Sequence, residues 1–127
     1  MAVGLVLLHS PLVGPGTWSE LAPLLRARGY GVTAPDYSAV MQGPQPYYEK
    51  IISAAAMIRP KEPVVFVAHS GAGALIPALA TKPGGQRSGA IFMDALLPHP
   101  GRAWFDTVSD TLKAHLRNVA RDGHVPP

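Results

Sequence analysis

Residues 64–73 read VVFVAHSGAG, an apolar run that gives way to small residues around one serine. Residues 64–67 are all β-branched or aromatic, which is typical of a short strand buried on both faces. Apolar residues recur beyond Gly73, and we expect a helix from Gly71 to about Thr81. A strand, a tight turn that carries Ser70 and a helix make up a nucleophile elbow, in which the serine hydroxyl stands above the sheet.

The residue types around Ser70 suit such a turn. Ala68 and Ala72 occupy positions that must be small, because the backbones of strand and helix nearly touch there. We expect a strained backbone at Ser70, which costs about 1–3 kcal/mol and persists only where it is used. The N–H groups at the start of the helix favour a developing oxyanion. Small residues also occur at strand-to-helix turns without catalytic function, so a purely structural interpretation stays open.

Three further apolar runs predict strands over residues 3–8, 31–34 and 90–93. Residues at helical spacing predict helices over 47–58, which Pro60 ends, and over 106–121. Another helix is expected to carry Leu21, Leu24 and Leu25 and to stop at Gly29. Strands that alternate with helices give an α/β fold with a parallel sheet and helices on both faces.

Two local features of the predicted helices follow from single residues. Thr17 or Ser19 is expected to cap the helix that contains Leu21. Pro77 falls inside the elbow helix, where its missing N–H is expected to bend the axis.

Composition excludes several classes of protein. At 127 residues the chain is one domain at most, and 47% hydrophobic residues allow a sizeable core. The eleven lysines and arginines are scattered, so we expect no nucleic-acid partner. The absence of cysteine rules out disulfides and thiolate metal sites, and we expect neither a metal nor a cofactor. The apolar start is too short for a leader or a membrane span, which predicts a cytoplasmic protein without membrane contact.

Reactive side chains follow the predicted strands. His9, Asp36, Ser70 and Asp94 each lie just past a strand's carboxyl end. Ligands of parallel α/β sheets bind at this edge of the sheet. We therefore expect the site there.

These residues carry a resemblance. The segment Leu7-Leu8-His9-Ser10-Pro11 is followed by Trp18, the elbow spans residues 68–73, and Phe92-Met93-Asp94 ends a strand. With these motifs the chain resembles the amino-terminal half of the α/β-hydrolase fold superfamily, most of all its small esterase and hydroxynitrile-lyase-like branch. The resemblance covers nearly all of residues 1–127, and it implies that residues 102–127 begin a lid.

The resemblance also implies catalytic roles. Ser70 would be the nucleophile, and the N–H of Gly71 one arm of the oxyanion hole. The second arm in the family lies two residues after the strand-end histidine, where this chain has Pro11, which has no N–H. Either Leu12 supplies that donor through a shifted loop, or the chemistry needs no two-armed hole.

The acid and the base are less clear from the resemblance. Asp94 sits where a minority of the superfamily places the acid that orients a histidine, although it also suits a turn or a helix cap. Asp36 is the weaker alternative, because its strand is expected farther from the elbow. The family's base histidine comes after the last strand, beyond this chain, and His99 near the site edge is a poor substitute.

We therefore predict a serine hydrolase-like enzyme that acts on a small apolar ester, thioester or lactone. A carboxyl-terminal fragment or a second chain is expected to complete the sheet and supply the histidine. A lyase, isomerase or cyclase of the same fold is an alternative, and so is an inactive binding half. Gly71-x-Gly73 with Asp94 also imitates a dinucleotide-binding fingerprint, but Ile76 replaces its third glycine.

Overall fold

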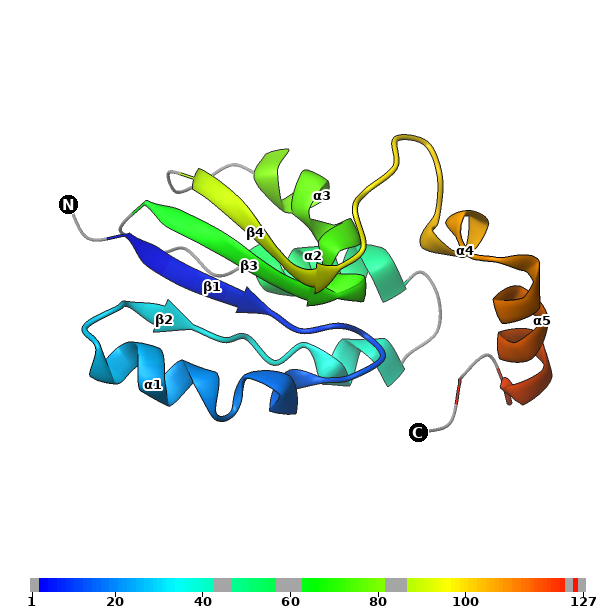
Figure 1. The fold of residues 1–127 in the computed structure, drawn as a ribbon, viewed down its shortest axis with the longest axis horizontal. Helices are drawn as coiled ribbons and strands as arrows, with labels where there is room; N and C mark the ends of the chain where they lie inside the picture. The colour runs from blue at the N-terminus through cyan, green and yellow to red at the C-terminus, as the bar shows by residue number, and fades with distance from the viewer. Residues whose placement is uncertain (1–2, 43–46, 57–62, 82–86, 123–124, 126–127) are drawn as a thin grey trace.

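A computed structural model describes residues 3–42, 47–56, 63–81, 87–122 and 125. Its four strands are β1 (Gly4–Leu8), β2 (Val32–Thr33), β3 (Val64–Ser70) and β4 (Arg87–Ala95). All pair in parallel, in the order β2-β1-β3-β4 (Figure 1). The predicted α/β fold with a parallel sheet is confirmed.

Two strands are longer than the sequence predicted. β3 continues to Ser70 and β4 from Arg87 to Ala95, because the two strands pair with each other along this whole length. Asp94, expected just beyond the strand, therefore lies within β4.

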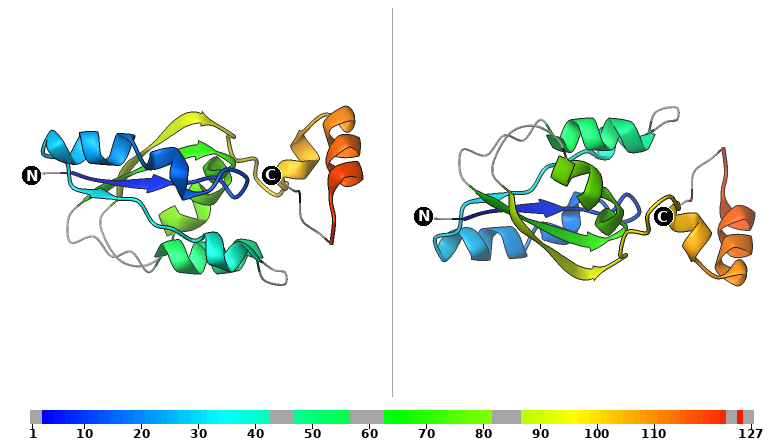
Figure 2. Two further views of the ribbon diagram at one scale, coloured as in Figure 1. Left: turned by 90° about the horizontal axis from the view of Figure 1, so that it is seen from below. Right: turned by 90° about the horizontal axis from the view of Figure 1, so that it is seen from above.

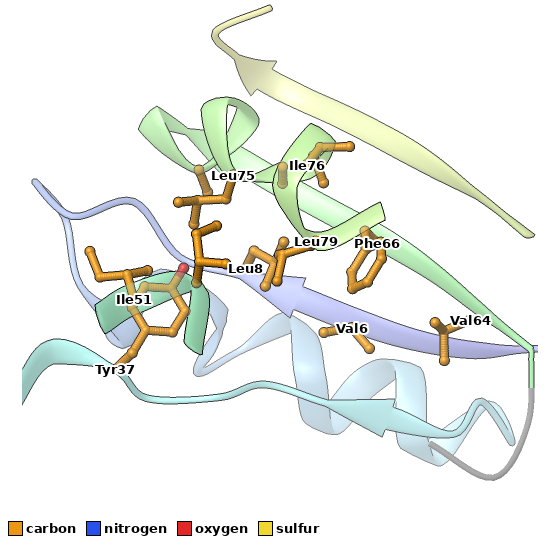
Figure 3. Packing of buried hydrophobic residues seen from close by; sticks show 12 residues of the cluster. Val6, Leu8, Tyr37, Ile51, Val64, Phe66, Leu75, Ile76 and Leu79 are labelled. Atoms are coloured by element: carbon orange, nitrogen blue, oxygen red, sulfur yellow. The ribbon is translucent and has the colours of Figure 1, made fainter. Parts of the chain in front are cut away.

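Helices cover both faces of the sheet (Figure 2). Helix α1 (Leu21–Ala27) lies on one face, and α2 (Tyr47–Ala56) and α3 (Ile76–Thr81) lie on the other. The larger core lies on the face of α2 and α3 and unites Val6, Leu8, Tyr37, Ile51, Ile52, Val64, Phe66, Ala68, Ala72, Leu75, Ile76 and Leu79 (Figure 3). A smaller cluster under α1 contains Leu7, Trp18, Ala22 and Val67.

The start of α1 differs from the expectation. A 3-10 turn, η1 (Pro15–Trp18), precedes α1. The N-cap residue of α1 is Glu20, whose side chain makes no capping hydrogen bond, so the prediction that Thr17 or Ser19 caps this helix was wrong. Leu24 is 58% exposed, and Ala22 is buried in the small cluster instead. Gly29 ends the helix with φ 88°, as expected.

The helix after the elbow is divided. A 3-10 segment, η3 (Gly71–Leu75), precedes α3, so Pro77 is the second residue of an α-helix rather than an interior one. A proline in the first turn removes no intrahelical hydrogen bond. The expected bend is thus replaced by a change of helix type before Pro77.

The chain after β4 leaves the sheet. Two helices, α4 (Trp104–Thr107) and α5 (Asp110–Val119), stand where one was predicted, because the Oγ of Ser109 caps a new start by accepting from the N–H of Leu112 (3.2 Å). Both lie beyond the carboxyl ends of the strands (Figures 1 and 2).

The remaining predicted segments are only partly described. The loop after Asp36 contains a short 3-10 turn, η2 (Ser38–Gln42). Ile58 and Pro60, at the predicted end of α2, lie outside the described residues. In the described part of the chain, no helix combines the length and apolar character needed to cross a membrane.

Candidate active site

Ser70 ends β3 in a strained conformation. Its backbone has φ 52° and ψ −126°, in the left-handed half of conformational space that side chains rarely adopt. Such a conformation costs about 1–3 kcal/mol and persists only where the surrounding structure imposes it. The strain expected at Ser70 is therefore present, and the residue is half-buried at the carboxyl edge of the sheet.

The small residues around Ser70 fill the space beneath the elbow. Ala68 and Ala72 are both fully buried in the larger core, so each methyl group is accommodated there. Gly71 opens η3, and the first N–H groups of a helical turn have no partner within it. The N–H of Gly71 is thus suited to a substrate oxygen that gains charge.

The side chain of Ser10 lies against Gly71. A Cβ on Gly71 would be 3.0 Å from the Ser10 Oγ and 3.5 Å from the Pro11 Cδ. Ser10 is fully buried, so its hydroxyl takes the room that a side chain at position 71 would need. A side chain at position 71 would therefore require the Ser10 hydroxyl to move.

Ser10 also organises the loop that follows β1. Its carbonyl accepts from the N–H groups of Val13 (3.3 Å) and Gly14 (3.0 Å), and its Oγ accepts from the N–H of Leu12 (3.1 Å). The amide expected to be the second oxyanion donor is therefore turned back to Ser10. Leu12 can fill that role only if the loop releases this hydrogen bond.

Asp94 forms a bulge in β4 beside the elbow. The pairing with β3 runs from His69↔Met93 directly to Ser70↔Ala95, which leaves Asp94 without a partner. Asp94 is exposed and has φ 44°. Bulges re-aim side chains and are frequent next to active sites.

His9 is a buried link between β1 and the segment after β2. Its Nδ1 donates to the Ser10 carbonyl (3.0 Å), and its Nε2 accepts from the N–H of Tyr37 (3.3 Å). The Tyr37 ring stacks on it at 3.8 Å, and the Tyr37 hydroxyl donates to the His9 carbonyl. Burial lowers the pKa of His9, and this pattern of donors and acceptors requires a neutral ring.

Asp36 is not brought to Ser70. It follows β2, and β1 separates β2 from β3. Its Oδ1 accepts from the hydroxyl and the N–H of Ser38, which lowers the pKa of the carboxyl, and it lies 4.0 Å from the His9 Nε2.

The other histidines of the described residues lie in different surroundings. The rings of His69 and Trp18 form an edge-to-face contact, with centroids 6.0 Å apart, and the buried Nδ1 of His69 has no hydrogen-bond partner among the described residues. His99 and His115 are exposed, and no hydrogen bond among the described residues joins a histidine to the Ser70 hydroxyl. His124 lies outside the described residues. No group of three potential metal ligands occurs within the described ranges.

Sequence reasoning missed Leu96, the residue directly after β4, which contacts the elbow. The N–H of Leu96 donates to the Ser70 carbonyl (3.0 Å), and the backbone of Leu96 passes over Gly73. Only the glycine at position 73 hinted at such a close approach.

Comparison with protein families decides the affiliation. Residues 5–126 match the model of the alpha/beta hydrolase family. This chain belongs to the alpha/beta hydrolase family. The chain is also 36% identical over 108 residues to polyneuridine aldehyde esterase from Rauvolfia serpentina, a match that covers 77% of the chain and 40% of that esterase.

Solved structures agree with this hydrolase fold. An extracellular alpha/beta-hydrolase from a Paenibacillus species matches with a TM-score of 0.78 over 92% of this chain and 50% of that one, at 21% identity. A pyrethroid hydrolase from Sphingobium faniae matches with a TM-score of 0.62 and 27% identity over 80% of this chain and 43% of that one. The chain thus spans half or less of the length of these relatives.

Proposed function

We propose that this chain is the amino-terminal part of a serine hydrolase that acts on a small apolar ester, thioester or lactone. Ser70 attacks the carbonyl carbon, and the N–H of Gly71 steadies the oxygen that gains charge. The observation that carries the proposal is the positive φ of Ser70 at the carboxyl end of a central strand. The relationship to an esterase and to a pyrethroid hydrolase supports the choice of an ester-like substrate.

Asp94 is proposed to orient a histidine that another part of the protein supplies. Its bulge lies next to Ser70 in the pairing of β3 with β4, and its side chain is exposed at the site edge. Without a histidine to accept its proton, the Ser70 hydroxyl is a weak nucleophile. We therefore expect very low activity of residues 1–127 alone.

The rest of the fold is proposed to come from a carboxyl-terminal part, continuous or separate, that extends the sheet at β4. The chain covers half or less of its solved relatives, and β4 is an edge strand with exposed apolar side chains. Residues 102–127, which contain α4 and α5 beyond the strand ends, would begin the lid (Figure 2).

Labelling with a fluorophosphonate probe tests the nucleophile. The sample is the complete hydrolase, meaning this chain together with the polypeptide that completes its sheet. We expect labelling of the wild type and none of Ser70→Ala. An unlabelled wild type would refute the proposal.

The same assay tests the acid. Asp94→Asn keeps the size and the tolerance for positive φ but removes the charge, and loss of the triad acid costs on the order of 10⁴-fold. The matched control is Asp122→Asn, because Asp122 is another exposed aspartate with a positive φ, 49°. Equal labelling rates for the two variants would remove Asp94 from the triad.

A lyase, isomerase or cyclase on the same fold is the second candidate. It is favoured by the oxyanion loop, where Pro11 has no N–H and the N–H of Leu12 is bound to Ser10. Loss of one oxyanion donor costs about 100- to 1000-fold in acyl transfer, a cost that does not arise in a reaction that forms no oxyanion. Turnover in ¹⁸O-labelled water distinguishes the two, because only hydrolysis incorporates the label.

A further inference from the structure

The backbone of Leu96 lies directly on the elbow. A Cβ on Gly73 would be 1.9 Å from the Leu96 carbonyl oxygen and 3.0 Å from its carbonyl carbon. Both are backbone atoms, so no side-chain rotation could relieve the overlap. Any residue other than glycine at position 73 must push the Leu96 segment away.

Leu96 also holds Ser70 directly. Its N–H donates to the Ser70 carbonyl at 3.0 Å. Leu96 alone therefore makes two contacts: it packs against the first turn of η3, and it holds the peptide group between Ser70 and Gly71. Gly73 is buried, so this approach is enclosed by the fold.

The bulge in β4 brings Leu96 to this position. The pairing skips Asp94, so Ala95 lies opposite Ser70 and Leu96 comes next. Ser70 and Asp94 are the two residues with positive φ in β3 and β4, at 52° and 44°. The two strained residues thus lie on either side of one break in the pairing.

We infer that the backbone of Leu96 is a clamp that keeps Ser70 in its strained conformation, and that Gly73 is a positioning residue because only glycine admits the clamp. The inference rests on the proposed nucleophilic role of Ser70. It gives the bulge at Asp94 a mechanical purpose in addition to the charge of its side chain.

The test compares two glycine-to-alanine variants of the complete hydrolase. Gly73→Ala is expected to slow fluorophosphonate labelling of Ser70 by about 100-fold, the effect of a misplacement of about 1 Å. Gly89→Ala is the control, because Gly89 lies in β4 and a Cβ there would meet nothing within 4 Å. Its labelling rate should equal that of the wild type.

Hydrogen exchange of the Leu96 amide measures whether the clamp is intact, and it does not depend on catalytic activity. The amide of Leu96 is expected to be protected in the wild type and in Gly89→Ala, and to exchange faster in Gly73→Ala. If the wild type is not labelled at all but the exchange result holds, the proposed function fails and the clamp stands.

A second variant serves if Gly73→Ala does not fold. Leu96→Pro removes the N–H that donates to Ser70, and the preceding residue Ala95 is already extended, as a proline requires. It should also slow labelling by about 100-fold. Wild-type labelling in a folded Gly73→Ala or Leu96→Pro variant, or slow labelling with the Leu96 amide still protected in Gly73→Ala, would overturn the inference.

Discussion

At the scale of single residues, the site depends on two glycines whose missing side chains leave room for an oxygen atom of another residue. The Ser10 hydroxyl occupies the space above Gly71, and the Leu96 carbonyl occupies the space above Gly73. In each pair the neighbour comes from a distant part of the chain. Substitutions at the two glycines should therefore be read together with those at their partners.

The pair of Ser10 and Gly71 makes a quantitative prediction. Gly71→Ala places a Cβ 3.0 Å from the Ser10 Oγ, and overpacking of this kind costs about 1–3 kcal/mol of unfolding free energy. Ser10→Gly removes the obstacle, so the double variant should recover part of that loss. Urea unfolding of the two single variants and the double variant measures the coupling.

The control for this cycle is Gly16→Ala. Gly16 has no positive φ, and a Cβ there would meet nothing within 4 Å, so a change within about 0.5 kcal/mol is expected. Strictly additive effects of Gly71→Ala and Ser10→Gly would show that the two residues do not compete for space.

At the scale of elements, β1 and the segment after β2 are joined by a neutral histidine. The Nε2 of His9 accepts from the N–H of Tyr37, a hydrogen bond that a protonated ring cannot make. Burial is the main reason for the lowered pKa of His9, and the hydrogen bond to the Ser10 carbonyl and the nearby Asp36 carboxylate oppose it only in part. Protonation of His9 in acid should therefore break its hydrogen bond with the Tyr37 N–H.

This link predicts how stability depends on pH. The unfolded chain has a histidine pKa near 6.5 and the folded pKa of His9 is lower, so below about pH 6.5 the unfolded state binds more protons. The free energy of unfolding should fall from about pH 6.5 down to the folded pKa of His9. Asp36 does not interfere, since its pKa lies below 3.8, and the pKa of Tyr37 is raised.

Denaturant unfolding at several pH values checks the prediction. His9→Asn should flatten the dependence between about pH 7 and about pH 5. His115→Asn, which changes an exposed residue of α5, should leave it as steep as in the wild type. Equal slopes in all three proteins would mean that His9 does not titrate on unfolding.

At the scale of the whole molecule, the sheet has one strongly apolar edge. Ile91, Phe92 and Met93 in β4 are 48%, 36% and 42% exposed. Ile91 and Met93 pair with Val67 and His69, so their side chains lie on the face that α1 covers. Phe92 pairs with Ala68, so its side chain lies on the opposite face. An exposed apolar edge strand is a template for pairing with further strands.

We therefore predict that the 127-residue chain associates with itself when expressed alone. Ile91→Lys combined with Met93→Lys places two charges on the edge and should give a monomer in sedimentation velocity experiments. Leu24→Lys is the control, because Leu24 is another exposed apolar residue, at 58%, but lies on α1. A wild-type chain that remains monomeric at all concentrations would contradict the prediction.

The sequence alone determined the four strands, their parallel arrangement and the turn at Ser70. These features are local: β-branched runs favour strands, and only small residues permit an elbow. The tertiary structure decided the bulge at Asp94, the engagement of the Leu12 amide, the clamp of Leu96 and the division of the helix before Pro77. The bulge and the position of Leu96 depend on atoms from a distant segment that approach within a few ångströms, and no pattern along the chain encodes such distances. The Leu12 amide and the helix type before Pro77 involve residues close in sequence, but residue types alone do not specify the backbone geometry that they adopt.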